Sequence, residues 1–415
     1  MKSATDTDYA AFIGIDWADR KHDLCLQAAG SSKREFDELP HRPERIAQWA
    51  QALRERSAGR AIALCVELNK GPLIYALQPY DFIVLYPVNP TTLAKYREAF
   101  CLSHAKDDPS DAELALEVLL KHRDKLSPLH PQSTAMRALQ RLVEQRRALV
   151  NDTTRITNRL TDALKQYFPQ VLDWFRDKNT VMFCDFLTRW PTLKQAQRAR
   201  KTRLTAFFLE HHLRYPKIIE QRLQAILSAT ALTTDPAVIV PNRLLVEVLV
   251  QQLRVVLQAV ERFDGEIAQL AATMPDFTLF STLPGAGPVF APRLLAAFGE
   301  QRERYASAAA MQKYSGIAPV TERSGKQCWV HWRLQCPTFL RQTFVEWTAQ
   351  SIPHSYWAKA FYEQQRARGA SHQAALRALA FKWIRILYRC WQDRTPYDEA
   401  TYLSALKRRG SPLLT

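Results

Sequence analysis

Short apolar runs alternate with amphipathic stretches over the first hundred residues, and this alternation constrains the fold more than any other feature. The runs are rich in Ile, Val, Leu and Cys, as buried strands are: residues 11–16, 23–27, 61–67 and 82–88. Between them, residues 42–56 carry apolar side chains at helical spacing. Gly71-Pro72 and Asn89-Pro90 each open a further helix. The pattern predicts an α/β sheet domain over residues 1–128.

Four carboxylates stand at the ends of these elements. Asp16 ends the first run and Glu67 ends the third. Asp108 and Asp111 begin a helix predicted to extend to about residue 121, with Asp108 as a natural N-cap and Asp111 on the same side of the first turn. Asp19 and Asp23 compete with Asp16, and Asp107 competes with Asp108, but the exit from the apolar strand favours Asp16.

A carboxylate at the end of a buried strand costs folding free energy unless it is paired with a cation. Carboxylates that converge from separate segments are suited to Mg²⁺ or Mn²⁺, which prefer hard oxygen ligands. Strand-end acids with a late DxxD pair describe a ribonuclease-H-like nuclease core, in which metal ions activate a nucleophile and neutralise the scissile phosphate. The alternative for each acid alone is a helix cap or a solvated surface residue.

The charge balance points to nucleic acid as the partner. The 415 residues include 57 Lys and Arg against 41 Asp and Glu, a net charge of +16. Such a surface attracts nucleic acid or an anionic membrane, but no apolar run approaches the roughly 20 residues that span a bilayer, and no signal peptide is recognisable. The seven cysteines are scattered without a CxxC pair, which favours reduced thiols in a cytosol over disulfides or structural zinc.

A helical arm is predicted over residues 129–275. Apolar side chains recur at helical spacing in residues 132–168 and 242–272, which predicts either an antiparallel coiled-coil or dimerisation arm, or an intramolecular bundle. The segment between them, about residues 169–241, is aromatic and contains a basic stretch. It is interpreted as a helical insert that either contacts nucleic-acid backbone or presents a solvated helix face.

Residues 276–415 predict a mainly helical C-terminal domain with two features of interest. Residues 283–288 (LPGAGP) resemble a helix-hairpin-helix turn, although a loop that needs two glycines for its geometry would look the same. Ser324 lies in Arg323-Ser324-Gly325-Lys326, where a hydroxyl between two cations is suited to attack phosphorus. A serine beside glycine is also common in simple turns.

These motifs resemble the IS110-family transposases (the IS110/IS1111 group). Asp16 in FIGIDWADRKHDLCL, Glu67 in CVELNKGP, and Asp108 with Asp111 in AKDDPSDAELAL look like the DEDD signature of that family. LPGAGPVFAPRLLAAFG and RYASAAAMQKYSGIAPVTERSGK look like its C-terminal transposase domain, in which the serine corresponding to Ser324 is the nucleophile. The likeness covers the α/β domain, the arm and the C-terminal domain in the family's order.

The resemblance implies a RuvC-like N-terminal domain and a bridge-RNA-guided recombinase that excises and inserts an insertion sequence. It implies carboxylates that bind Mg²⁺, a phosphoserine link to donor and target DNA, and an active site shared between subunits of a dimer or tetramer. An element-encoded noncoding RNA would be the guide, and the protein would act in the bacterial cytoplasm at the nucleoid. The residues expected to contact phosphates are Arg323, Lys326, Arg333 and Arg341.

Two other functions remain open from the sequence. A RuvC-like structure-specific nuclease would use the four acids for hydrolysis and would not need Ser324. A non-catalytic nucleic-acid-binding relative would carry the acids as caps alone. Mg²⁺-dependent DNA chemistry separates the enzymes from the binding protein, and a covalent protein–DNA adduct separates the recombinase from the nuclease.

Overall fold

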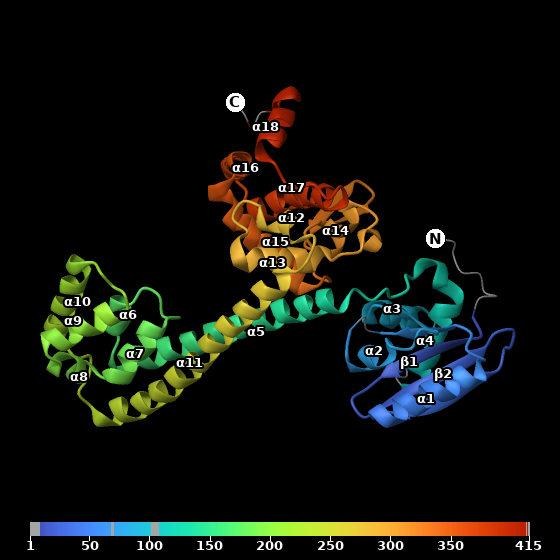
Figure 1. The fold of residues 1–415 in the computed structure, drawn as a ribbon, viewed down its shortest axis with the longest axis horizontal. Coiled ribbons are helices and arrows are strands. Elements are labelled where there is room, and N and C mark those ends of the chain that lie inside the picture. Colours follow the sequence, from blue (N-terminus) through green and yellow to red (C-terminus); the bar gives the residue numbers. More distant parts are fainter. Residues whose placement is uncertain (1–8, 68–69, 101–107, 412, 414–415) are drawn as a thin grey trace. The chain divides into compact units, whose positions relative to one another are not determined.

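The structure, a computed structural model, describes residues 9–67, 70–100, 108–411 and 413. The chain divides into two compact units, Met1–Pro131 and Gln132–Thr415, which Figure 1 shows in blue to teal and in teal to red. In the described residues, no helix combines the length and the apolar character that crossing a membrane requires. The mixed α/β character predicted for the N-terminal region and the largely helical character predicted for the rest are both confirmed.

The first unit is built on a five-stranded sheet of order β3-β2-β1-β4-β5. Its strands are β1 (Ala11–Trp17), β2 (Lys21–Ala28), β3 (Arg34–Pro40), β4 (Ile62–Val66) and β5 (Ile83–Pro87). The first three strands form antiparallel pairs, whereas β4 and β5 run parallel to β1. The carboxyl ends of β1, β4 and β5 therefore lie along one edge of the sheet.

Helices cover both faces of this sheet. The helices of the unit are α1 (Pro43–Arg56), α2 (Pro72–Leu77), α3 (Pro90–Phe100) and α4 (Asp108–His122), followed by a 3₁₀ turn, Arg123–Lys125. Apolar side chains of α1 and α2 pack with Ile13 and Ile15 on one face. On the other face, α4 packs with Phe12, Ala63 and Cys65. Because side chains alternate along a strand, Asp16 and Glu67 share this second face with α4.

Strand β3 was not predicted. Its sequence, REFDELP, is mostly polar, and three of its seven residues are exposed because it is the outer strand beside β2. A strand that buries little apolar surface lacks the alternation from which strands are predicted. Cys25 and Cys65, predicted to be core residues, are fully buried, and burial raises the pKa of the Cys65 thiol to about 12.

The second unit contains two long helices, α5 (Thr134–Tyr167) and α11 (Pro236–Ala272), that pack against each other in opposite directions (Figure 1). The start of α5 shares a core with the end of α11 through Leu139 and Ile267. The end of α5 shares a second core with the start of α11 through Leu160 and Val246. The predicted helix pair is therefore present. The division of the chain into three domains stays a prediction.

The insert between these helices is helical, as predicted. Its helices are α6 (Val171–Trp174), α7 (Val181–Arg189), α8 (Leu193–Arg198), α9 (Lys201–Glu210) and α10 (Pro216–Ser228). Its aromatic side chains, such as Phe186 and Phe207, are fully buried, so they form a core and not a nucleic-acid surface. The predicted start of α11 at residue 242 was wrong: the helix begins at Pro236, capped by Asp235, and continues through Pro241.

The rest of the second unit forms a largely helical core around four fully buried tryptophans: Trp347, Trp357, Trp383 and Trp391. Its helices are α12 (Phe277–Ser281), α13 (Gly287–Phe298), α14 (Ala308–Tyr314), α15 (Thr338–Ser351), α16 (Tyr356–Ala367), α17 (His372–Gln392) and α18 (Glu399–Arg408), with 3₁₀ turns at Arg302–Arg304 and Ile352–His354. Two short strands, β6 (Val320–Ser324) and β7 (Gln327–His331), form a hairpin between α14 and α15. This hairpin was not predicted.

The LPGAGP turn joins α12 to α13 and has a packing reason for its first glycine. Gly285 has φ +69°, and a side chain there would overlap the backbone carbonyl of Gln350 on α15. The indole N–H of Trp347, also on α15, donates to the carbonyl of Pro284 at 3.1 Å. Internal geometry therefore accounts for this turn, as the alternative interpretation of the sequence allowed.

Candidate active site

Two of the predicted acids meet because their strands are parallel neighbours. Strands β1 and β4 pair with Ile15 opposite Val66, so Asp16 and Glu67 leave the sheet side by side on the face that α4 covers. Both side chains line one pocket of about 330 Å³. Asp19 and Asp23, the competitors of Asp16, do not line it. Asp23 lies opposite Asp16 on β2, is buried, and has Lys21 Nζ at 3.8 Å from its carboxylate.

Asp111 reaches the same pocket because α4 crosses β1 at Gly14. A Cβ atom at Gly14 would overlap the backbone of Ala112 and Leu116, so only glycine permits this approach. Ala112 and Ala115, which face the sheet, are fully buried. The crossing places Asp111, one residue before the contact, beside the end of β1, where its carboxylate is only 10% exposed. Three of the four predicted acids therefore line one cavity.

Asp108, the fourth predicted acid, opens α4. Its side chain lies outside the described residues, as does the competing Asp107. Its membership of the acidic site stays a prediction, based on its position one helical turn before Asp111.

Arg97 is a cation in this pocket that the sequence interpretation missed. It comes from α3, which follows β5, and its guanidinium forms an ion pair with the carboxylate of Asp111. Pro90, Ala94 and Arg97 all line the pocket, and their i, i+4, i+7 spacing puts them on one face of α3. That spacing, on a helix directly after a parallel strand, is the signal from which Arg97 is predictable.

The turn after β1 is held by a histidine pair. The backbone N–H of Ala18 donates to Nδ1 of His22 at 3.3 Å, so the proton of His22 is on Nε2, which donates to Nδ1 of His41 at 2.9 Å. His22 is fully buried, and burial together with the neighbouring His41 lowers its pKa to about 4. Since Trp17 and Ala18 line the pocket, this neutral histidine fixes one of its walls.

The donor chemistry of the pocket suits a hard divalent cation, because three carboxylates face one small cavity. In this structure, however, one of the three carboxylates, that of Asp111, is paired with Arg97. Within the described part of the chain, no three His, Cys, Asp or Glu side chains are positioned together as metal ligands. An oxygen of Asp111 is already bound by Arg97. A metal bound here would therefore have to share Asp111 with Arg97 or displace it.

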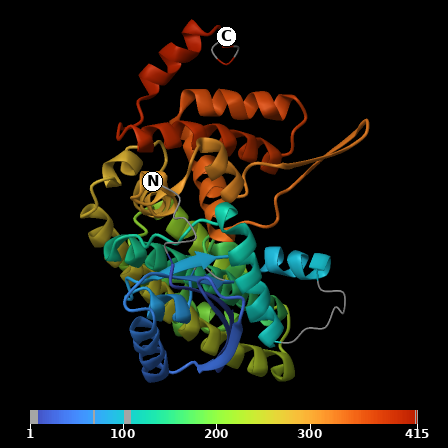
Figure 2. The ribbon, with the colours of Figure 1, turned by 90° about the vertical axis from the view of Figure 1, so that its right-hand side faces the viewer.

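Ser324 is the last residue of β6, at the tip of the exposed β6–β7 hairpin, which Figure 2 shows extending away from the helices of its unit. Ser324 pairs with Gln327 across a two-residue turn, Gly325-Lys326, in which Gly325 has φ +56°. A positive φ at the first of two turn residues followed by a negative φ is the type II′ geometry, which glycine favours. Every residue from 321 to 332 is exposed, so the hydroxyl of Ser324 is accessible.

The two faces of this hairpin differ. Directly paired residues share a face, so Ser324 lies with Gln327, Glu322 and Trp329, whereas Thr321, Arg323, Cys328 and Val330 lie on the opposite face. Trp329 is 44% exposed. Diagonal neighbours in an antiparallel pair are about 7–8 Å apart, which is within reach of an indole ring. An open aromatic surface therefore lies beside Ser324.

The four cations expected to contact phosphates have different roles in the structure. Arg323 and Lys326 are exposed at the hairpin tip. Arg333 and Arg341 support the base of the hairpin: Nε of Arg333 donates to the carbonyl of Ala318, and Arg341 donates to the carbonyl of Arg333, each at 3.4 Å. Phosphate contact by each of the four stays a prediction, and its geometric basis is strongest for Lys326 in the turn, because Arg323 lies on the face opposite Ser324.

Similarity to known proteins covers both sites. A family model described as a transposase matches residues 13–169, a span that contains the acidic pocket. A second model, described as a transposase of the IS116/IS110/IS902 family, matches residues 277–363, a span that contains Ser324.

Individual relatives, matched over 57% to 97% of their own lengths, include transposases and an insertion-element protein. The chain is 26% identical to the mini-circle putative transposase for IS117 from Streptomyces coelicolor over 97% of both proteins. It is 26% identical to the 43.6 kDa protein of insertion element IS110 from the same species, over 71% of this chain and 72% of that one. It is 27% identical to the putative transposase y4uE of Sinorhizobium fredii over 49% of this chain and 57% of that protein.

The protein is therefore a transposase, an enzyme of DNA recombination, and DNA is its partner. The chain belongs to the IS110 family.

Proposed function

We propose that this transposase exchanges DNA strands through a covalent phosphoserine intermediate on Ser324, with Asp16, Glu67, Asp108 and Asp111 as a Mg²⁺ site in a RuvC-like domain. The observation that carries the proposal is the pair of contrasting sites. One is a partly buried acidic pocket lined by residues of β1, of α3, of α4 and of the end of β4. The other is an exposed serine at the tip of a hairpin, with Arg323 before it in the strand and Lys326 after it in the turn.

The chemistry of the serine site balances without an outside energy source. Oγ of Ser324 forms a bond to phosphorus while the bond from phosphorus to one deoxyribose oxygen breaks, and the proton lost by the serine hydroxyl is balanced by the proton that the leaving deoxyribose oxygen takes up. A deoxyribose hydroxyl of the exchanged strand then forms the new phosphodiester, and the serine oxygen leaves. Lys326, in the turn that follows Ser324, would stabilise the charge that develops on the phosphate oxygens, and Arg323, on the opposite face, would contact a flanking phosphate.

The carboxylates of the acidic pocket would hold the divalent metal. When bound, Mg²⁺ (or Mn²⁺) would polarise the phosphate and stabilise negative charge on its oxygens. Asp16 and Glu67 are fixed by the paired strands, and Asp111 is fixed by the contact of α4 with Gly14. The backbone positions that carry these carboxylates are therefore set before substrate binds, which favours electrostatic catalysis, while Asp111 still has to be shared with Arg97 or released from it to bind a metal.

We further propose that a bridge RNA guides the reaction. The resemblance of the motifs to the IS110 family supports this part of the proposal. A net charge of +16 suits binding of several polyanionic strands, because phosphate neutralisation dominates such affinities. In an RNA-guided enzyme, base pairing reads the DNA sequence and the protein binds backbone.

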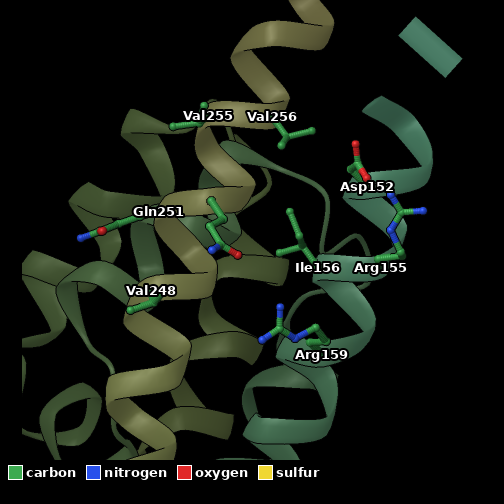
Figure 3. A pocket seen from close by; sticks show the side chains of 9 residues that line it. Asp152, Arg155, Ile156, Arg159, Val248, Gln251, Val255 and Val256 are labelled. Carbon is green, nitrogen blue, oxygen red and sulfur yellow. Dashed lines mark hydrogen bonds and ion pairs between the residues drawn. The ribbon is translucent and has the colours of Figure 1, made fainter. Parts of the chain in front are cut away.

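We also propose that the protein forms a homo-oligomer with a shared active site. Exposed apolar residues of α11 support this part of the proposal. Leu244, Val248 and Val255 are each more than half exposed and, with Gln251, follow the 4-3-4 spacing of a coiled-coil seam. Val248, Gln251 and Val255 also line a pocket of about 700 Å³ between α11 and α5, with Ile156 and Arg159 opposite (Figure 3). A second copy of α11 would cover this stripe.

Covalent trapping tests the proposal. The protein, copurified with RNA from the flanks of its own element, is incubated with labelled donor and target DNA and Mg²⁺, then separated on a denaturing gel. The matched variants are Ser324→Ala and Thr321→Ala, since Thr321 is an exposed hydroxyl on the opposite face of the same hairpin. We expect a protein-linked DNA band in the wild type and in Thr321→Ala, and its loss in Ser324→Ala.

A hydrolytic nuclease is the second candidate, because the acidic pocket lies wholly within one compact unit and is formed without the hairpin. It predicts free cut ends, Mg²⁺ dependence and equal activity in the wild type and Ser324→Ala. Cleavage of that kind without any adduct would replace the recombinase mechanism.

A further inference from the structure

Arg97 is placed inside the acidic pocket and not on its surface. Its side chain is 22% exposed, and the Asp111 carboxylate that it binds is 10% exposed. Among the described residues, Nε of Arg97 is buried and has no hydrogen-bond partner. A buried guanidinium nitrogen left without a partner costs free energy. The ion pair with Asp111 therefore holds Arg97 in a position that does not satisfy all of its donors.

The charges explain why a cation is needed at this position. Asp16, Glu67 and Asp111 line the same pocket, and like charges in a poorly solvated site repel one another. A metal ion would remove this repulsion. Without a metal ion, the guanidinium of Arg97 supplies a positive charge in this cavity and offsets the negative charge of Asp111.

We propose that Arg97 is a placeholder cation: it offsets part of the negative charge of the acidic pocket before metal loading, competes with the divalent metal for Asp111, and must leave that carboxylate for the metal to bind. This inference rests on the proposed function of the pocket. It accounts for the absence, among the described side chains, of a three-ligand metal arrangement in a cavity lined by three carboxylates.

The helix that carries Arg97 provides a matched control. Lys95 is an exposed cation on α3, two residues before Arg97, and does not line the pocket. Lys95→Gln and Arg97→Gln remove the same formal charge from the same helix. A general electrostatic effect on metal affinity would appear in both variants, whereas competition for Asp111 appears only in Arg97→Gln.

The experiment measures Mn²⁺ affinity by the loss of the free-ion electron paramagnetic resonance signal, on the full-length protein without DNA or RNA. We expect Arg97→Gln to bind Mn²⁺ about tenfold more tightly than the wild type, which corresponds to about 1.4 kcal/mol. Lys95→Gln should stay close to the wild type. Thermal unfolding provides a second readout: without metal, Arg97→Gln should unfold at a lower temperature than Lys95→Gln, and Mn²⁺ should close that gap.

A double-mutant cycle keeps the test decisive if a single variant folds poorly. In an Asp111→Asn background the competition is already absent, so Arg97→Gln should no longer change Mn²⁺ affinity. Equal or weaker Mn²⁺ binding by Arg97→Gln in the otherwise wild-type protein overturns the placeholder role and leaves the metal site intact. Absence of Mn²⁺ binding by all variants and the wild type overturns the metal site of the proposed function, and the placeholder with it.

Discussion

The acidic pocket and the serine hairpin differ in almost every physical respect. Asp16, Glu67 and Asp111 are positioned by a sheet and a helix in contact over fully buried residues. Ser324 is positioned by a two-stranded hairpin whose residues from 321 to 332 are all exposed. An isolated hairpin is only marginally stable in water, so this one depends on its base and on what it binds.

The two sites should therefore respond to different disturbances. The pocket is pre-organised, so it should be sensitive to changes of packing and of pH within its own unit. The hairpin is accessible and weakly supported, so it should be sensitive to the loss of contacts with nucleic acid. Four predictions follow this contrast, from the largest expected effect to the smallest.

Replacing Asp16 by Asn should abolish strand exchange, because it removes a carboxylate from the proposed metal site while keeping the side chain's shape. We expect a loss of at least about a thousandfold, or roughly 4 kcal/mol of transition-state stabilisation. Recombination of donor and target DNA in vitro measures it. Asp19→Asn is the control, since Asp19 is exposed and does not line the pocket. Unchanged recombination by Asp16→Asn contradicts the metal assignment.

Replacing Gly14 by Ala should disrupt the pocket from a distance. The added methyl group would meet the backbone of Ala112 and Leu116, so α4 must shift and carry Asp111 with it. We expect a destabilisation of about 3 kcal/mol, measured by chemical unfolding, and loss of activity. Gly265→Ala on α11 is the opposite case, because that glycine has open space around it. There the substitution should stabilise the protein by up to about 1 kcal/mol.

Particular residues show how far the sequence predicts this architecture. The four apolar strands and the two long helices were predicted because burial leaves a periodic pattern of large side chains. Strand β3 and the β6–β7 hairpin leave no such pattern, since β3 has one buried residue and the two strands of the hairpin have none. The start of α11 was misplaced because Pro241 suggests a boundary, whereas the capping of the helix by Asp235 sets the true one.

The candidate site shows the same limit. The convergence of Asp16 and Glu67 follows from parallel strands, and it was predicted from acids at strand ends. The approach of Asp111 depends on Gly14, and the position of Arg97 depends on the face that α3 presents. The first is a consequence of packing between elements distant in sequence, which no local pattern encodes, whereas the spacing of Pro90, Ala94 and Arg97 on α3 was a local signal that the sequence interpretation missed.

Lowering the pH should loosen the wall of the pocket. The pKa of His22 is about 4 in the folded protein because of burial, against an ordinary value of 6.5. Between these values the unfolded chain binds more protons than the folded chain, so the free energy of unfolding falls as the pH drops from 6.5 to 4. The full effect is at most about 3 kcal/mol. Well above pH 6.5, His22 is neutral in both the folded and the unfolded chain and adds no pH dependence to the free energy of unfolding.

Amide hydrogen exchange in residues 17–28, corrected for intrinsic rates, measures this loss, since Ala18 donates to His22. We expect protection to decrease at pH 5 relative to pH 7.5 in the wild type. In His22→Gln, which does not titrate, protection should change less over the same range. An equal decrease in both proteins would show that another group governs this response.

Replacing Trp329 by Ala should weaken DNA binding at the hairpin. Trp329 is exposed on the face of Ser324, and an indole offers a surface on which a base can stack. We expect about a tenfold loss of affinity, from the roughly 1–3 kcal/mol that one stacked base contributes, with Trp329→Phe keeping most of it. Val330→Ala is the matched control, because Val330 is exposed on the opposite face of the same strand. Equal losses in Trp329→Ala and Val330→Ala would mean that both faces contact DNA, and the face of Ser324 would then have no special relation to the substrate.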